Sequence, residues 1–97
     1  MKQILLIEDD PAIADPLTYA LARENWQVVW HDTGIAALAA LQQQAFDCII
    51  LDVGLPDTDG FELCRRIRRD WATPLIFLTA RNEEVDRIVG LELGADD

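Results

Sequence analysis

Three carboxylates in this sequence stand where short apolar runs end. Glu8 and Asp9 follow the run at residues 4–7, and Asp52 follows the run at residues 48–51. Apolar runs of this length are typical of buried parallel strands, and the carboxyl ends of such strands line the edge where open α/β sheets bind ligands. We therefore expect the carboxylates to converge in one crevice, where they repel one another unless a cation lies among them. This pattern predicts a divalent-metal site with an aspartate placed for chemistry.

The elements that must position these residues alternate along the chain. Strands are predicted at about residues 3–7, 27–30, 47–51 and 74–78. Helices are predicted at about residues 11–24 and at residues 60–69. Another helix is expected to begin at residue 33 or 34, and a last one to run from about residue 82 to a stop at Gly94. This order implies right-handed crossovers and a parallel sheet with helices on both faces, which is an α/β fold.

The predicted helices have recognisable caps and apolar stripes. Asp10 is expected to cap the first helix rather than to bind metal, and Asp32 or Thr33 to cap the second. We interpret Asp57 and Asp59 as loop and cap residues. The apolar stripes are Ile13, Leu17, Ala20 and Leu21; Ile35, Leu38, Ala39 and Leu41; Phe61, Leu63, Cys64 and Ile67; and Val85, Ile88 and Val89.

Composition excludes several classes of protein. The chain has 97 residues, enough for one domain, and its 51% hydrophobic content supports a globular core. Every apolar run is much shorter than a membrane span, which needs about 20 residues. No signal region is recognisable at the N-terminus, so we expect a cytoplasmic protein. A net charge of −10 argues against binding nucleic acid through the general field of this segment.

The tryptophans and cysteines are interpreted as structural. The three tryptophans, Trp26, Trp30 and Trp71, are scattered among the ends of predicted helices and strands. We interpret them as packing residues and not as a platform on which nucleic-acid bases stack. Cys48 and Cys64 form no CxxC pair, and we expect two reduced core thiols.

Several stretches together match one known family. They are LIEDD at residues 6–10, LDVGLP at 51–56 with Gly60, FLTAR at 77–81 and GLELGADD at 90–97. Over its whole length the chain resembles the receiver domain of two-component response regulators. The last two stretches look most like the OmpR/PhoB winged-helix subfamily, including regulators of the CreB type. The resemblance implies a flavodoxin-like (CheY-like) parallel sheet of strand order 2-1-3-4.

The resemblance also implies how the metal is held. Asp9 corresponds to a direct carboxylate ligand of Mg²⁺, Glu8 to a ligand acting through a metal-bound water, and Gly54 to a ligand through its backbone carbonyl. Asp52 completes the set. Mg²⁺ prefers about six oxygen ligands and keeps several waters, so these groups suit it without histidine or cysteine, and Mn²⁺ is an alternative ion.

Phosphoryl chemistry is implied at the same residues. Asp52 corresponds to the phospho-acceptor, Thr79 to the switch hydroxyl that bonds a phosphoryl oxygen, and Ala80 to the small neighbour that leaves room for it. Gly54 and Arg81 fall at positions that tune the lifetime of the phosphoryl group. Asp52 must be ionised to attack, and a bound dication counters the repulsion from its carboxylate neighbours.

The family pattern extends beyond residue 97. Receiver domains continue with a fifth strand, a phosphate-binding lysine and a fifth helix. The only lysine here, Lys2, stands at the start of the first predicted strand, far from the crevice. We therefore expect residues 1–97 to be a receiver domain cut short at its C-terminal end, followed in the parent protein by a DNA-binding output domain. Residues 1–97 alone should be phosphorylated weakly or not at all.

The expected function is signalling rather than enzymatic turnover. A sensor histidine kinase would phosphorylate Asp52, and the domain would catalyse only its own phosphorylation and dephosphorylation. We expect a homodimer or other self-association, including strand exchange at the edge of the strand at residues 74–78. Contact with DNA is expected only through the output domain, and none with membranes.

Other functions remain open at this point. A metal-dependent aspartyl phosphatase or phosphotransferase would act on small substrates, but haloacid dehalogenase-type enzymes have a second acid two residues after the nucleophile, where Gly54 stands. A metal-binding interaction domain would not require Thr79 and Ala80. A stand-alone phosphorelay receiver without a DNA-binding output fits the same residues.

Overall fold

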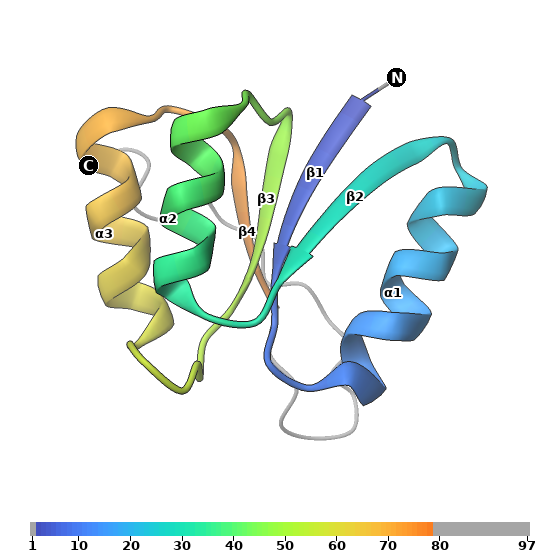
Figure 1. The fold of residues 1–97 in the computed structure, drawn as a ribbon, viewed down its shortest axis with the longest axis horizontal. Helices are drawn as coiled ribbons and strands as arrows, with labels where there is room; N and C mark the ends of the chain where they lie inside the picture. The colour runs from blue at the N-terminus through green and yellow to red at the C-terminus, as the bar shows by residue number, and fades with distance from the viewer. Residues whose placement is uncertain (1, 79–97) are drawn as a thin grey trace.

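A four-stranded parallel sheet with helices on both faces forms the described part of this chain, residues 2–78 of a computed structural model (Figure 1). The elements are β1 (Lys2–Ile7), α1 (Pro11–Arg23), β2 (Trp26–His31), α2 (Gly34–Gln43), β3 (Cys48–Asp52), α3 (Gly60–Asp70) and β4 (Leu75–Leu78). The strand order is β2-β1-β3-β4, as expected. The helix predicted from about residue 82 and its stop at Gly94 lie outside the described residues.

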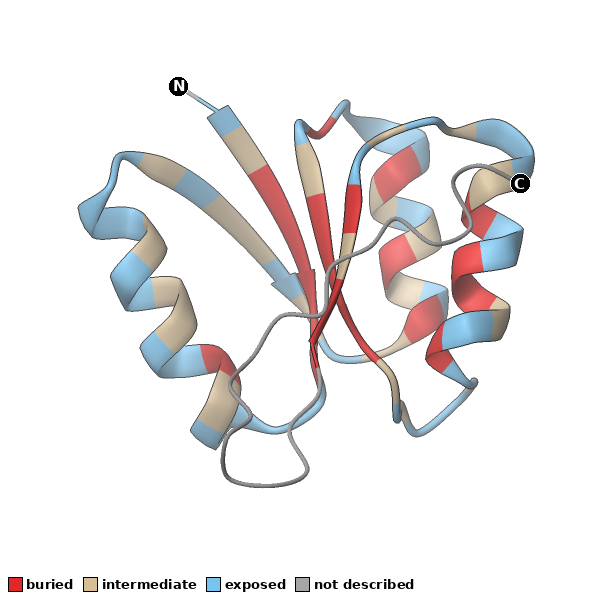
Figure 2. Ribbon diagram, turned by 180° about the vertical axis from the view of Figure 1, so that it is seen from behind, coloured by how far each residue is buried: buried red, intermediate tan, exposed pale blue. Residues whose placement is uncertain are grey.

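The central strands are buried on both faces. Leu5 and Ile7 of β1 pack on the side of α2 and α3, whereas Ile4 and Leu6 pack on the side of α1. Figure 2 shows the buried residues concentrated in the middle strands and on the helix faces turned toward them. Burial on both faces explains why β1 and β3 are continuous apolar runs rather than alternating ones. All the strands run in one direction, so their carboxyl ends share one edge of the sheet.

Local capping confirms three of the helix starts. The Asp10 carboxylate accepts a hydrogen bond from the Ala12 N–H at 2.9 Å, and the Thr33 hydroxyl accepts one from the Ala36 N–H at 3.1 Å. The Asp59 carboxylate accepts from the N–H of Phe61 at 3.0 Å and caps the start of α3. None of the helices within residues 2–78 has the length and apolar character that crossing a membrane requires.

The buried face of α2 agrees with the predicted one in part, because Leu41 is buried and Leu38 packs against the core. Gly34, Ala37 and Leu41 face the core, while Ile35 is 71% exposed and Ala39 is also exposed. The start of α2 packs closely, since a Cβ at Gly34 would lie 2.7 Å from the Thr58 Cγ2 atom. The absence of a side chain at Gly34 allows this close approach, and Gly34 lies on the buried face with Ala37 and Leu41.

Two further core predictions were wrong in part. Ala20 is exposed, and Ala14 is the fully buried residue of α1. Phe61 is 47% exposed instead of buried. Its ring packs against Phe77 of β4, with centroids 4.9 Å apart, because it lies at the beginning of α3 and leans over the end of the sheet. Leu63, Cys64 and Ile67 are buried as predicted.

Candidate functional site

Glu8 follows β1 directly, and its backbone is bonded to the end of β2. The Glu8 N–H donates to the carbonyl of His31 at 3.1 Å, and the Glu8 carbonyl accepts from the indole N–H of Trp30 at 2.7 Å. Its side chain turns back toward the first turn of α1, where Oε2 accepts from the Asp10 N–H at 3.0 Å. The turn that carries Glu8 and Asp9 is thus held by residues both near and distant in sequence.

Asp52 is the last residue of β3, the strand that lies between β1 and β4. Ile7 pairs with Leu51 in the β1–β3 register, and the residues that follow these two, Glu8 and Asp52, both belong to the candidate site. Asp52 itself pairs with Leu78 of β4. Parallel register therefore brings the two carboxylates together, as the strand-end pattern predicted.

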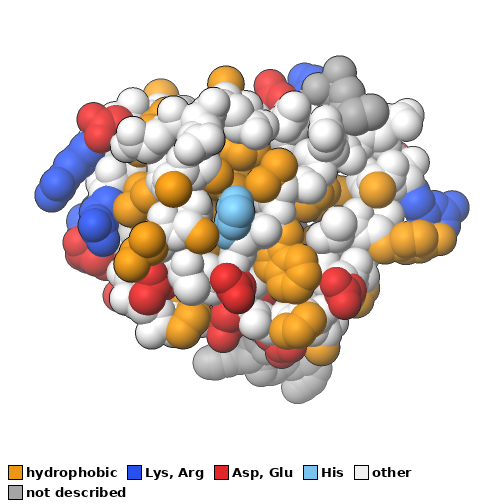
Figure 3. All heavy atoms as spheres, viewed as in Figure 1, with side chains coloured by type: hydrophobic (Ala, Val, Ile, Leu, Met, Phe, Trp, Pro, Cys, Tyr) orange, Lys and Arg blue, Asp and Glu red, His pale blue; other side chains and the backbone are white. Residues whose placement is uncertain are grey.

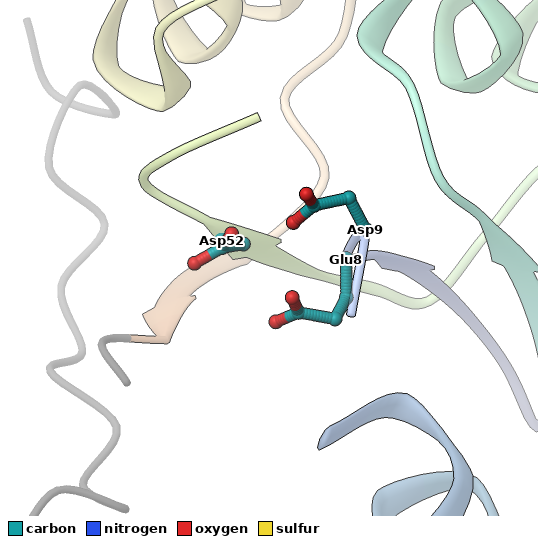
Figure 4. A group of neighbouring side chains, drawn as sticks. All are labelled: Glu8, Asp9 and Asp52. Atoms are coloured by element: carbon teal, nitrogen blue, oxygen red, sulfur yellow. The ribbon is translucent and has the colours of Figure 1, made fainter. Parts of the chain in front are cut away.

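The three predicted carboxylates form a cluster. One oxygen from each of Glu8, Asp9 and Asp52 lies within 4.8 Å of the others, and Figure 4 shows the side chains converging from the ends of β1 and β3. Glu8 is 1% exposed and Asp52 is 9% exposed, whereas Asp9 is exposed. Two of the charges are therefore largely withdrawn from water.

Burial and mutual repulsion disfavour the ionised forms. Burial, together with smaller contributions from the charges of Asp52 and Asp9, raises the pKa of Glu8 from an ordinary 4.5 to about 7, against the opposing hydrogen bond from the Asp10 N–H. Burial likewise raises the pKa of Asp52, with a further contribution from the Asp9 charge, against the opposing backbone N–H groups of Gly54 and Val53. At neutral pH the cluster therefore carries charge that the protein alone stabilises poorly.

The protein offers the cluster no cation of its own within residues 2–78. The salt bridge described there joins Arg65 to Glu62 on α3, at 2.8 Å. In the space-filling view, Lys and Arg side chains lie toward the periphery, and several of the acidic side chains lie along the lower part, away from them (Figure 3). Within residues 2–78, no salt bridge therefore offsets the negative charge of the cluster.

One buried oxygen tests whether a metal ion fits here. Glu8 Oε1 is buried and has no hydrogen-bond partner among the described residues. An unpaired buried carboxylate oxygen is costly unless a cation or water completes its coordination. Every donor in the cluster is a carboxylate oxygen, the ligand type that hard dications such as Mg²⁺ prefer. The residues present therefore fit a hard dication.

The loop after β3 is shaped by Gly60. A Cβ at this position would lie 2.5 Å from the carbonyl oxygen of Asp52, and the Gly60 N–H donates to the Val53 carbonyl at 2.8 Å. The start of α3 therefore rests on the backbone of the candidate nucleophile. Gly54 is the opposite case, because a Cβ there would meet no atom within 4 Å. The metal-binding role of the Gly54 carbonyl stays a prediction.

Three long-range hydrogen bonds at this edge were missed by sequence reasoning. Asp57, interpreted as a loop residue, accepts from the N–H groups of Gly34 at 2.8 Å and Ile35 at 3.0 Å. These bonds lower the pKa of Asp57, the Gly34 bond most strongly. Trp30, interpreted as a packing residue, is bonded to Glu8. Neither pairing leaves a local signal, because the partners lie more than 20 residues apart.

Other predicted residues lie away from the cluster or outside the described part. Lys2 begins β1, at the opposite end from Glu8, and its amino group lies 6.0 Å from the centre of the Trp26 ring. Thr79, Ala80 and Arg81 lie outside the described residues.

Known proteins are similar to this chain in sequence and in fold. The family described as the response regulator receiver domain matches residues 4–97. The transcriptional regulatory protein AfsQ1 of Streptomyces coelicolor is 52% identical over 97 residues, 100% of this chain and 43% of AfsQ1. The transcriptional regulatory protein CreB of Escherichia coli is 50% identical over 97 residues, 99% of this chain and 42% of CreB. The chain thus spans less than half the length of these relatives.

A solved structure with bound ligands is also similar. The response regulator protein TrrA from Thermotoga maritima, in complex with Mg²⁺ and BeF, has a TM-score of 0.78 and 31% sequence identity. The match covers 84% of this chain and 72% of the other.

Proposed function

Because this chain belongs to the response regulator receiver domain family, we propose that Asp52 accepts a phosphoryl group from a sensor histidine kinase in a Mg²⁺-dependent reaction. One observation supports this most strongly. Three carboxylates converge at the carboxyl edge of the sheet, and a buried oxygen of Glu8 lacks a hydrogen-bond partner among residues 2–78. A site of this kind suits both a hard dication and a carboxylate nucleophile.

The metal site is proposed to use oxygen ligands only. Asp9 and Asp52 would bind Mg²⁺ directly, Glu8 would act through a bound water, and Gly54 would contribute its backbone carbonyl. Mn²⁺ would accept the same ligands. When bound, the ion would neutralise charge that develops on the transferred phosphoryl group.

Asp52 is the proposed nucleophile because it is held in place by β3 and faces the shared crevice. A carboxylate oxygen of Asp52 would form the new P–O bond while the P–N bond of the donor phosphohistidine breaks, and the imidazole nitrogen would leave with the electron pair. Water attack on the acyl phosphate would later release inorganic phosphate and restore the carboxylate. The rigid placement of Asp52 on a buried strand supplies alignment, the main requirement of such transfers.

Readout is proposed to pass through Thr79 and Ala80. The Thr79 hydroxyl would donate a hydrogen bond to a phosphoryl oxygen, and Ala80 would leave room for the phosphate. Phosphorylation adds negative charge, and a hydrogen bond made only in that state would bias an equilibrium between two existing conformations.

The wider biological role is proposed from the relatives. We infer that residues 1–97 belong to a receiver domain in a cytoplasmic transcriptional regulator, with a winged-helix output domain that binds DNA. Self-association, in which β4 could exchange between copies, belongs to the same proposal. Turnover of small external substrates is disfavoured, because Gly54 offers no second acid two residues after Asp52.

Intact-mass analysis tests the phospho-acceptor. The protein that carries this chain is incubated with acetyl phosphate and Mg²⁺, and a gain of one phosphoryl group is expected. Asp52→Asn should abolish this gain, and a metal chelator should suppress it in the unsubstituted protein. Equal labelling of the Asp52→Asn variant would refute the assignment.

A further inference from the structure

Trp30 connects the edge of the sheet to the acidic cluster. Its indole N–H donates to the Glu8 carbonyl at 2.7 Å, a short hydrogen bond between residues 22 positions apart. Next to it, the Glu8 N–H donates to the carbonyl of His31 at 3.1 Å. The two polar groups of the Glu8 backbone are therefore both bonded to the end of β2.

This bond constrains Asp9 through the geometry of the peptide unit. The Glu8 carbonyl and the Asp9 N–H belong to one nearly planar group, so fixing the carbonyl direction also fixes the orientation of that group. The Asp9 side chain makes no hydrogen bond or ion pair with residues 2–78. Its placement near Glu8 and Asp52 consequently depends on the backbone that carries it.

Packing alone does not account for this tryptophan. Trp30 is 37% exposed and lies on β2, at the edge of the described sheet. A half-exposed ring at an edge contributes less burial than a core tryptophan would. What distinguishes Trp30 is the directed N–H donor, which a phenylalanine of similar shape would lack.

We propose that Trp30 is a positioning residue for the metal site: its indole N–H holds the Glu8–Asp9 peptide so that Asp9 is presented to the dication. This inference rests on the proposed function, since it assumes that Asp9 and its neighbours bind Mg²⁺. It adds a residue outside the acidic cluster, and it makes the indole proton a reporter of metal binding.

The main test replaces Trp30 by phenylalanine in the protein that carries this chain. Mg²⁺ titrations followed by the backbone amide NMR signals of Asp9 and Asp52 give the dissociation constant. Loss of one hydrogen bond should weaken Mg²⁺ binding about threefold to tenfold. Trp26→Phe is the matched control, because Trp26 lies on the same strand at the end away from the cluster, and it should leave the constant unchanged.

A second readout separates positioning from a general loss of stability. With acetyl phosphate as donor, Trp30→Phe should raise the Mg²⁺ concentration for half-maximal labelling and leave the rate at saturating Mg²⁺ unchanged. Equal Mg²⁺ affinity in Trp30→Phe and the unsubstituted protein would overturn the proposal, even if the variant unfolds more easily.

The unsubstituted protein provides a test that needs no variant to fold. Its Trp30 indole N–H signal should shift during the Mg²⁺ titration with the same midpoint as the Asp9 amide, while the Trp26 indole signal stays in place. A stationary Trp30 signal beside a moving Asp9 amide would overturn the role of Trp30 alone. If the Asp9 and Asp52 amides do not respond to Mg²⁺, the proposed metal site fails and this inference fails with it.

Discussion

The Asp57 carboxylate caps a helix that begins 23 residues earlier in the chain, accepting a hydrogen bond from the Gly34 N–H at 2.8 Å. Its second oxygen accepts from Ile35 at 3.0 Å. The loop that follows Asp52 is thereby tied to the first turn of α2. A helix start has unsatisfied N–H groups and a partial positive charge, which explains why a distant carboxylate is bound there.

Removing this cap should destabilise the fold. Asp57→Ala should lower the free energy of unfolding by about 0.5–2 kcal/mol, the range measured for helix N-cap residues, and Asp57→Asn should lower it less. The pKa of Asp57 is lowered in the folded protein, so its contribution is present above the unfolded pKa near 3.8 and lost as pH falls through the folded value. Urea denaturation at pH 7 and pH 3 measures both effects.

Asp32→Ala is the matched control for this cap. Asp32 is an exposed acid just before the same helix, but Thr33 and Asp57 supply the observed caps. A loss of stability in Asp32→Ala as large as in Asp57→Ala would indicate a general charge effect instead of the specific hydrogen bonds.

Glu8 should make the metal-free protein less stable as pH rises. Its pKa is about 7 folded and near 4.5 unfolded, so its contribution is fully present below 4.5 and lost as pH rises through about 7. Glu8→Gln should therefore be more stable than the unsubstituted protein at pH 8, by about 1–3 kcal/mol, and similar to it at pH 4.5. Thermal unfolding in chelator across this range measures the difference.

Asp52→Asn provides a comparison for the pH effect. The pKa of Asp52 is raised as well, so this variant should also gain stability at pH 8. Saturating Mg²⁺ should reduce the gain seen with Glu8→Gln, because the ion stabilises the ionised cluster. If Glu8→Gln and the unsubstituted protein had the same free energy of unfolding at every pH, this would contradict the inference that burial raises the pKa of Glu8.

Two glycines near Asp52 should respond oppositely to alanine. A Cβ at Gly60 would lie 2.5 Å from the Asp52 carbonyl oxygen and 2.7 Å from the Val53 Cα, both backbone atoms that cannot move aside cheaply. Gly60→Ala should therefore cost about 1–3 kcal/mol or more of stability and displace Asp52. Gly54→Ala meets open space and should fold normally. Denaturation midpoints of the two variants provide the test, and equal losses would contradict it.

Gly54→Ala also allows the phosphoryl lifetime to be examined in a folded protein. If this position tunes dephosphorylation, the half-life of the labelled protein should change while its stability does not.

The parallel sheet and the acidic cluster could be predicted because both depend on short-range patterns, whereas the strand order was predicted from the family resemblance. Apolar runs buried on both faces marked β1 and β3, and the shared direction of parallel strands placed Glu8 beside Asp52. The family similarity confirms the receiver-domain prediction. The predicted α2 face was wrong in part: Leu41 is buried and Leu38 packs against the core, but Ile35 and Ala39 are exposed, although they satisfy helical spacing as well as Gly34 and Ala37 do.

The hydrogen bonds that support the site could not be predicted in the same way. Trp30 and Asp57 bind partners through geometry that exists only after the sheet and α2 have assembled. The side chains themselves are ordinary for an edge strand and a loop. Thr79 and Ala80 lie outside residues 2–78, and their roles stay predictions.

Mg²⁺ should stabilise the folded protein, because Glu8, Asp9 and Asp52 form a cluster only in the folded state. A ligand that binds the folded state alone adds about 2.7 kcal/mol at one hundred times its dissociation constant, so the unfolding temperature should rise with Mg²⁺ and fall again when chelator removes the ion. Asp9→Asn should weaken this response strongly. Asp15→Asn is the control, because Asp15 is exposed on α1 and outside the cluster. Equal stabilisation of both variants would point to nonspecific screening of the net charge of −10, which sodium chloride at matched ionic strength would reproduce.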